Sequence, residues 1–167
     1  MTTSEELYVW TWLPGHTEPV LAGRVDREGA GPELFRRIAM NIAISNNDDR
    51  ARNHAAFWDG RHLELTPAYD LAPGQRSGDS FAQAMAYGRG DPGAKVSNFA
   101  ALVGESETYG LSASQGRAII DQLVASIDDN WDDAAEVSRL SAADRTQLRS
   151  RQILPRAAFF GYEATPL

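Results

Sequence analysis

A chain of 167 residues is long enough for one domain with its own core, since a domain of about 150 residues buries roughly 70% of the surface that its unfolded chain exposes. Hydrophobic residues make up 43% of the chain and charged residues 23%, a composition that excludes wholesale disorder. The net charge of −7 argues against nonspecific binding to nucleic acid, and the absence of cysteine excludes disulfides and zinc–thiolate sites.

Membrane association and secretion are not expected either. No apolar run approaches the roughly 20 residues of a membrane-spanning helix. The opening MTTSEE lacks the basic and apolar regions of a secretory signal. We therefore expect a cytoplasmic protein without a membrane partner.

The first predicted element is a β-hairpin. The stretch LYVWTWLPGHTEPVLAGRV alternates apolar and polar residues around Trp10 and Trp12, breaks at Pro14-Gly15 and resumes at Val20. The polar DREGAGP that follows is typical of a linker. Its Gly-Ala-Gly is too short to indicate a phosphate-binding loop.

A deeply buried helix is predicted from Pro32. Apolar side chains recur after it at three- and four-residue spacing and also occupy the far side of the helix, namely Leu34, Phe35, Ile38, Met40, Ile42 and Ile44. Short polar side chains at Ser45-Asn46-Asn47 favour a turn and end this helix. The polar run NNDDRARNH is therefore predicted to be the loop that leaves a core helix.

A smaller hairpin is predicted next. The short alternating runs AAFW and RHLELT lie on either side of Asp59-Gly60, a strong turn dipeptide. The sequence PAYDLAPGQRSGDS, rich in Pro, Gly, Ser and Asp, then predicts an irregular surface loop.

The remainder of the chain is predicted to be helical. Ser112 and Gln115 have the spacing of a capping box at the start of a helix. Ser141 and Asp144 similarly begin a segment that runs toward Pro155. The expected fold class is mainly α with small β elements (α+β).

The order of these elements suggests a function for the polar loop. Protein kinases use a catalytic loop D-x-x-x-x-N, in which the Asp accepts the substrate hydroxyl proton and the Asn binds Mg²⁺, and a later Asp binds Mg²⁺ beside the phosphates. Asp48 and Asn53 have that spacing, and a hairpin after them can return the chain so that Asp70 lies near Asn53. One amide oxygen and one carboxylate are sufficient protein ligands for a Mg²⁺ ion that also binds phosphates and waters.

Each of these residues also has a purely structural interpretation. Asp48 and Asp49 are typical of a turn after a helix, and the Asp-x4-Asn pattern alone is weak. Asp70 can form an Asx turn and Tyr69 a packing contact. The ordered set favours the kinase interpretation. The three histidines lack the spacing of a metal site, so zinc is not expected.

These residues carry a family resemblance. The stretch FRRIAMNIAISNNDDRARNHAAFWDGRHLELTPAYDLAP resembles the C-terminal kinase lobe of the HipA family, the toxins of HipA/HipB-type toxin–antitoxin pairs. The resemblance continues through QAMAYGRGD and the C-terminal helices, and the opening hairpin is similar to the start of these toxins. It implies that residues 1–27 are a remnant of an N-terminal β subdomain and that residues 28–167 form a protein-kinase-like C-lobe.

The resemblance implies a serine/threonine protein kinase that uses ATP and Mg²⁺. Asp48 matches the family's catalytic aspartate, and Asn53 and Asp70 match its magnesium ligands. Tyr69, which precedes Asp70, is a candidate nucleotide-site residue. Arg50 stands where the family commonly has a histidine, and it is a candidate phosphate or nucleotide contact.

The resemblance also implies partners. The first is a HipB-like helix-turn-helix antitoxin, through which the toxin contacts DNA only indirectly. The second is a protein substrate, which in family members with an understood target is an aminoacyl-tRNA synthetase or another translation component.

The chain departs from the family between the first hairpin and the buried helix. A HipA-type kinase carries most of its N-lobe there, with a glycine-rich loop, an ATP-contacting lysine and a hinge, whereas DREGAGP spans this interval here and Lys95 is the only lysine. Because phosphoryl transfer depends on positioning and charge stabilisation, we expect impaired kinase activity unless a separate polypeptide supplies the lobe. The alternatives are a non-catalytic remnant that binds an antitoxin or acts as a decoy, and an unrelated helical domain whose polar loop is only a turn.

Overall fold

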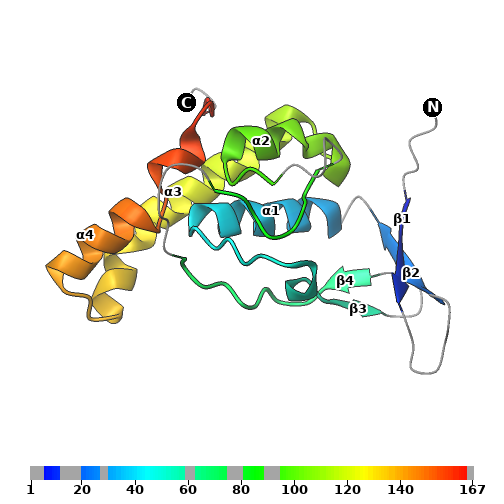
Figure 1. Ribbon diagram of the computed structural model, residues 1–167, viewed down its shortest axis with the longest axis horizontal. Coiled ribbons are helices and arrows are strands. Elements are labelled where there is room, and N and C mark those ends of the chain that lie inside the picture. The colour runs from blue at the N-terminus through cyan, green and yellow to red at the C-terminus, as the bar shows by residue number, and fades with distance from the viewer. Residues whose placement is uncertain are drawn as a thin grey trace.

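The computed structural model describes residues 6–11, 20–26, 30–58, 63–74, 81–88 and 95–164. Within these residues the short strands gather at one end of the molecule, and helices and irregular loops make up the rest (Figure 1). The predicted α+β class with small β elements is thereby confirmed.

The N-terminal hairpin forms as predicted. Strands β1 (Glu6–Thr11) and β2 (Val20–Asp26) pair antiparallel from Glu6 opposite Asp26, with a register irregularity between Val9 and Trp10. The predicted turn at Pro14-Gly15 lies outside the described residues.

Helix α1 (Ala30–Ala43) is the buried helix that the apolar spacing predicts. Phe35, Ile38 and Ile42 are wholly shielded from solvent. The helix begins two residues before Pro32, so the end of the supposed DREGAGP linker is helical. Proline is tolerated there because the first-turn N–H groups of a helix have no intrahelical partner.

Helices α2 (Phe99–Gly104) and α3 (Ala113–Val137) complete the core with α1 (Figure 1). Phe99, Leu102 and Ile120 are wholly buried against Phe35 and its neighbours. Full burial of a side chain of this size contributes about 1.5–3 kcal/mol, so these contacts hold α1, and the loop that leaves it, in place.

The C-terminal helices begin at the predicted caps. Ser112 and Gln115 form a capping box at the start of α3, and the Ser141 hydroxyl accepts a hydrogen bond from the Asp144 amide at 3.2 Å at the start of α4 (Ala142–Arg151). Short 3-10 turns follow α2 and α4, at Ser106–Tyr109 and Arg156–Phe159. No described helix is both long and apolar enough to span a bilayer.

The polar loop and the small hairpin lie beside α1. Residues 46–54 are irregular apart from a 3-10 turn at Ala51–Asn53. Strands β3 (Ala56–Trp58) and β4 (Leu63–Leu65) pair antiparallel as predicted, and their Asp59-Gly60 turn lies outside the described residues. The described part of the following surface loop is irregular and mostly exposed, again as predicted.

The prediction that the remainder of the chain is helical was wrong for residues 81–88 and 95–98. These residues contain no helix and form an isolated bridge between Ala82 and Val96. The sequence GRGDPG inside this segment explains the difference, because glycine and proline are the poorest helix formers. The segment still contributes Tyr87 to the core.

Candidate functional site

The polar loop leaves α1 through a strained turn. Ser45 has a φ of 58°, in the left-handed region that residues other than glycine rarely adopt. The C-terminal segment secures this turn, since the Ser45 hydroxyl donates to the Gln152 carbonyl at 2.8 Å and the Leu154 amide donates to the Ala43 carbonyl at 2.7 Å. The loop therefore starts from a fixed point.

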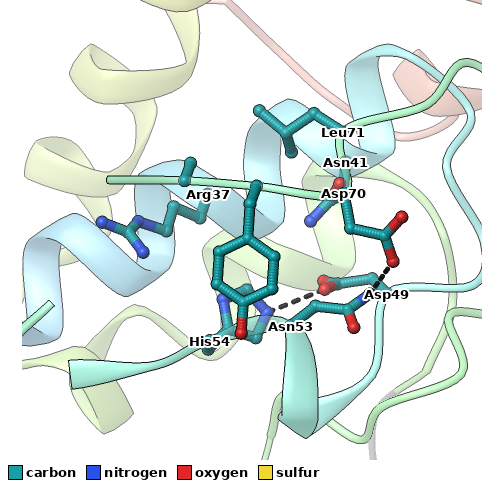
Figure 2. A pocket seen from close by; sticks show the side chains of 9 residues that line it. Arg37, Asn41, Asp49, Asn53, His54, Asp70 and Leu71 are labelled. Carbon is teal, nitrogen blue, oxygen red and sulfur yellow. Dashed lines mark hydrogen bonds and ion pairs between the residues drawn. The ribbon is translucent and has the colours of Figure 1, made fainter. Parts of the chain in front are cut away.

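Asn53 and Asp70 lie together at the end of this loop. The Asn53 Nδ2 donates to the Asp70 Oδ2 at 2.7 Å (Figure 2). It also lies 3.4 Å from the Asp48 carbonyl oxygen. Asn53 is buried and Asp70 is exposed. The hairpin thus returns the chain as expected and brings two of the predicted site residues into contact.

Asp48 and Arg50 form an ion pair at the surface. The Arg50 Nε donates to the Asp48 Oδ1 at 2.7 Å, and the Asp48 side chain is 61% exposed. Exposed pairs of this kind contribute about 0–1 kcal/mol, so the Asp48 carboxylate is easily released. Arg50 therefore contacts Asp48 and does not join Asn53 and Asp70.

Tyr69 packs over the loop from the segment that carries Asp70. Its hydroxyl donates to the Arg52 carbonyl at 2.6 Å, and its ring is partly exposed. It borders a shallow pocket whose lining residues are Arg37, Asn41, Asp49, Asn53, His54, Ala68, Tyr69, Asp70 and Leu71. The five candidate residues thus divide into a pocket group, Asn53, Tyr69 and Asp70, and a surface pair, Asp48 and Arg50.

Sequence reasoning missed the buried polar floor of this pocket. Asp49, treated as a turn residue, is buried, and its Oδ1 lies 2.7 Å from the His54 Nε2 (Figure 2). Arg37 is buried on α1, where its Nε donates to the Glu33 Oε1 at 3.0 Å and its Nη2 donates to the Thr66 carbonyl. No local sequence pattern predicts these contacts, because neither adjacent charged residues nor a single histidine indicates which side chains are buried.

Two buried amides were also missed. Asn41 lies on α1 and Asn46 begins the loop, and their side chains are hydrogen-bonded at 2.9 Å. The polar residue at position 41 inside an apolar helix is the one signal that could have identified this contact.

The donor set at Asn53 and Asp70 fits Mg²⁺ together with a phosphate ligand. In the described part of the chain, no group of three or more histidine or acidic side chains is placed to hold a metal ion. Mg²⁺ commonly takes one or two carboxylates and completes its shell with waters and substrate phosphates. Asn53 and Asp70 carry an amide oxygen and a carboxylate, the ligand types that such a shell needs, and in this structure the Asn53 Nδ2 faces Asp70.

The fold and this site define an α+β protein whose polar loop has the residue order of a kinase catalytic loop. The family model described as "HipA-like C-terminal domain" matches residues 20–131, more than half of the chain. The chain therefore belongs to that family, which confirms the resemblance seen in the sequence. No match was found among curated proteins or solved structures.

Proposed function

We propose that this chain is a HipA-type toxin of a type II toxin–antitoxin system, a serine/threonine kinase lobe that transfers the γ-phosphate of ATP to a protein hydroxyl. The observation that carries the proposal is the contact between Asn53 and Asp70, at 2.7 Å, in a chain of the HipA-like family. In this proposal residues 1–27 are an N-terminal remnant and residues 28–167 are the lobe.

The residues have distinct roles in this proposal. The exposed Asp48 carboxylate accepts the hydroxyl proton of the substrate once Arg50 has released it. Asn53 and Asp70 would hold Mg²⁺, which supplies charge neutralisation at the ATP phosphates. Tyr69, at the edge of the pocket, and the half-exposed guanidinium of Arg50 are proposed nucleotide contacts.

The proposed partners follow from the same family. They are a HipB-like helix-turn-helix antitoxin, which would also be the only link to DNA, and a translation component as the phosphorylated protein. Such a toxin would act in the cytoplasm. Its catalytic rate should be low, because the chain has neither a glycine-rich loop nor a lysine before Lys95 to position the phosphates.

One observation favours a second function, a non-catalytic module that binds the antitoxin or acts as a decoy. The carboxylate of the candidate base Asp48 is paired with Arg50, and Asp48 does not line the pocket that contains Asn53 and Asp70. A lobe that only binds a partner does not need this carboxylate to be free.

Phosphate transfer from radiolabelled ATP to a protein acceptor tests the proposal. We expect slow labelling that requires Mg²⁺ and disappears in Asp48→Asn, while Asp129→Asn, an exposed acid on α3, retains it. Equal background labelling in the unsubstituted protein and in Asp48→Asn would rule out catalysis. Copurification with a helix-turn-helix protein, combined with no heat of Mg-ATP binding by calorimetry, would support the second function.

A further inference from the structure

We propose that Asn46 is a positioning residue that fixes Asp48 and Asp70 relative to each other, an inference that rests on the proposed function of these two carboxylates. Asn46 is the first residue of the polar loop and is 94% shielded from solvent, with a relative exposure of 6%. Its side-chain amide links three segments of the chain.

The first link is to the core. The Asn46 Nδ2 donates to the Asn41 Oδ1 at 2.9 Å, and the Asn46 backbone amide donates to the Asn41 carbonyl at 2.8 Å. Asn41 is 2% exposed and lies on α1 beside the wholly buried Ile42. Asn46 is therefore anchored to the buried helix α1.

The second and third links reach the two carboxylate residues. The Asn46 Nδ2 also donates to the Asp70 carbonyl oxygen at 3.0 Å, and the Asn46 Oδ1 accepts from the Asp48 amide at 3.3 Å. The Nδ2 of this amide thus donates to α1 and to Asp70, and its Oδ1 accepts from Asp48. No other side chain among the described residues hydrogen-bonds to the backbone of both Asp48 and Asp70.

Asp70 needs such a contact because its backbone is strained. Its φ is 58°, and in this left-handed region any residue other than glycine has a steric cost. In the described part of the chain, Asp70 accepts two hydrogen bonds, from Asn46 at its carbonyl and from Asn53 at its carboxylate. Asn46 holds the backbone, and this places the carboxylate within 2.7 Å of Asn53.

Nuclear magnetic resonance on the full chain tests the inference without metal. A hydrogen bond as short as 2.7 Å should move an Asn53 side-chain amide proton downfield and slow its exchange relative to the exposed Asn47. In Asn46→Ala and Asn46→Ser we expect this signal to shift toward that of an exposed asparagine, because neither side chain spans Asn41 and Asp70. The matched controls Asn47→Ala and Asn47→Ser should leave it unchanged.

Titration with Mn²⁺, a paramagnetic substitute for Mg²⁺, adds a second readout. Mn²⁺ should broaden the Asn53 and Asp70 signals of the unsubstituted protein, and the two Asn46 variants should bind it about 10- to 100-fold more weakly, the usual effect of losing a residue that orients a metal ligand. The two Asn47 controls should bind as the unsubstituted protein does.

The outcomes separate this inference from the proposed function. No broadening in any of the proteins would contradict the metal site, while a shifted Asn53 signal in the Asn46 variants would still support positioning by Asn46. An unchanged Asn53 signal in folded Asn46→Ala and Asn46→Ser would overturn the inference. Loss of the fold in both variants would also overturn it, because Asn46 would then be needed for folding and not specifically for the site.

Discussion

The Nε2 atom of His54 lies 2.7 Å from the Oδ1 atom of Asp49, and both of these polar-loop side chains are at least nine-tenths buried (Figure 2). The second oxygen of Asp49 and the Nδ1 of His54 are buried and have no hydrogen-bond partner among the described residues. The hydrogen bond between the two side chains therefore replaces, for each of them, contacts with water that burial removes.

A double-mutant cycle should detect this dependence. We expect Asp49→Ala and His54→Ala each to lower the free energy of unfolding by about 1–3 kcal/mol, because each leaves one buried polar partner unsatisfied. The double variant should lose less than the sum, with a coupling of about 1 kcal/mol or more in urea unfolding. The same cycle on the exposed pair Asp48 and Arg50 should give a coupling below about 1 kcal/mol. Strict additivity at Asp49 and His54 would contradict this account.

The parts of the fold that the sequence could predict are those with a local periodic signal. The apolar spacing around Phe35 and Ile38 predicted α1, and the Ser112–Gln115 spacing predicted the start of α3. The start of α1 was missed because glycine and alanine before Pro32 are compatible with either a linker or a first helical turn. The irregular segment after residue 80 was missed although its glycines and proline signalled it.

The candidate site, like the fold, could be predicted from the sequence only in part. The order of Asp48, Asn53 and Asp70 along the chain was readable, and the hairpin predicted that Asn53 and Asp70 would meet. The direction in which each side chain of the loop points was not readable. It depends on long-range contacts, such as the one from Asn46 to the Asp70 carbonyl, which an irregular loop does not encode as a period.

Alkaline pH should destabilise the fold through Tyr87 and Tyr109. Burial is the main cause that raises the pKa of both phenols above the usual 10.0. The neighbouring Tyr87 then raises the pKa of Tyr109 further, and the negative charge of Glu105 raises the pKa of both. The Tyr109 hydroxyl donates to the Tyr87 carbonyl, and the Tyr87 hydroxyl donates to the Val96 carbonyl.

The sign of the effect follows from proton binding. Above pH 10 the unfolded chain loses phenolic protons that the folded chain retains, so the free energy of unfolding falls as pH rises, by up to about 1.4 kcal/mol per pH unit for each tyrosine. Urea unfolding at pH 8, 9.5 and 10.5 measures this slope. Tyr109→Phe should start less stable and show a shallower slope, and an identical slope in Tyr109→Phe would exclude Tyr109 as a cause.

A methyl group at Gly116 should destabilise the core. A Cβ added there would lie 2.3 Å from the Ser106 Oγ and 3.1 Å from the Phe35 ring, and Ser106 is buried with its hydroxyl donating to the Val103 carbonyl at 2.7 Å. Overpacking of this kind typically costs about 1–3 kcal/mol, so Gly116→Ala should lower the thermal unfolding midpoint by several degrees.

Gly104→Ala is the matched control for this substitution. Gly104 ends α2, and no atom of the described residues lies within 4 Å of the position of an added Cβ. Alanine is also the better helix former, so the midpoint should stay the same or rise slightly. A similar fall in both variants would show that the contact with Ser106 and Phe35 is not the cause.

The strained backbone of Asp70 should lower the free energy of unfolding of the protein. At its φ of 58°, glycine is unstrained and alanine is not, so we expect Asp70→Gly to be more stable than Asp70→Ala by about 1 kcal/mol in urea unfolding. Both variants remove the same hydrogen bond from Asn53, so the difference between them reports the backbone alone. The same comparison at Ala68, which has an ordinary φ, should have the opposite sign, because Ala68→Gly only adds entropy to the unfolded chain.

Neither Asp70 variant should show broadening of the Asn53 signal by Mn²⁺. A strained residue whose replacement by glycine leaves the fold intact while removing the metal site is one whose conformation serves the site and not the fold.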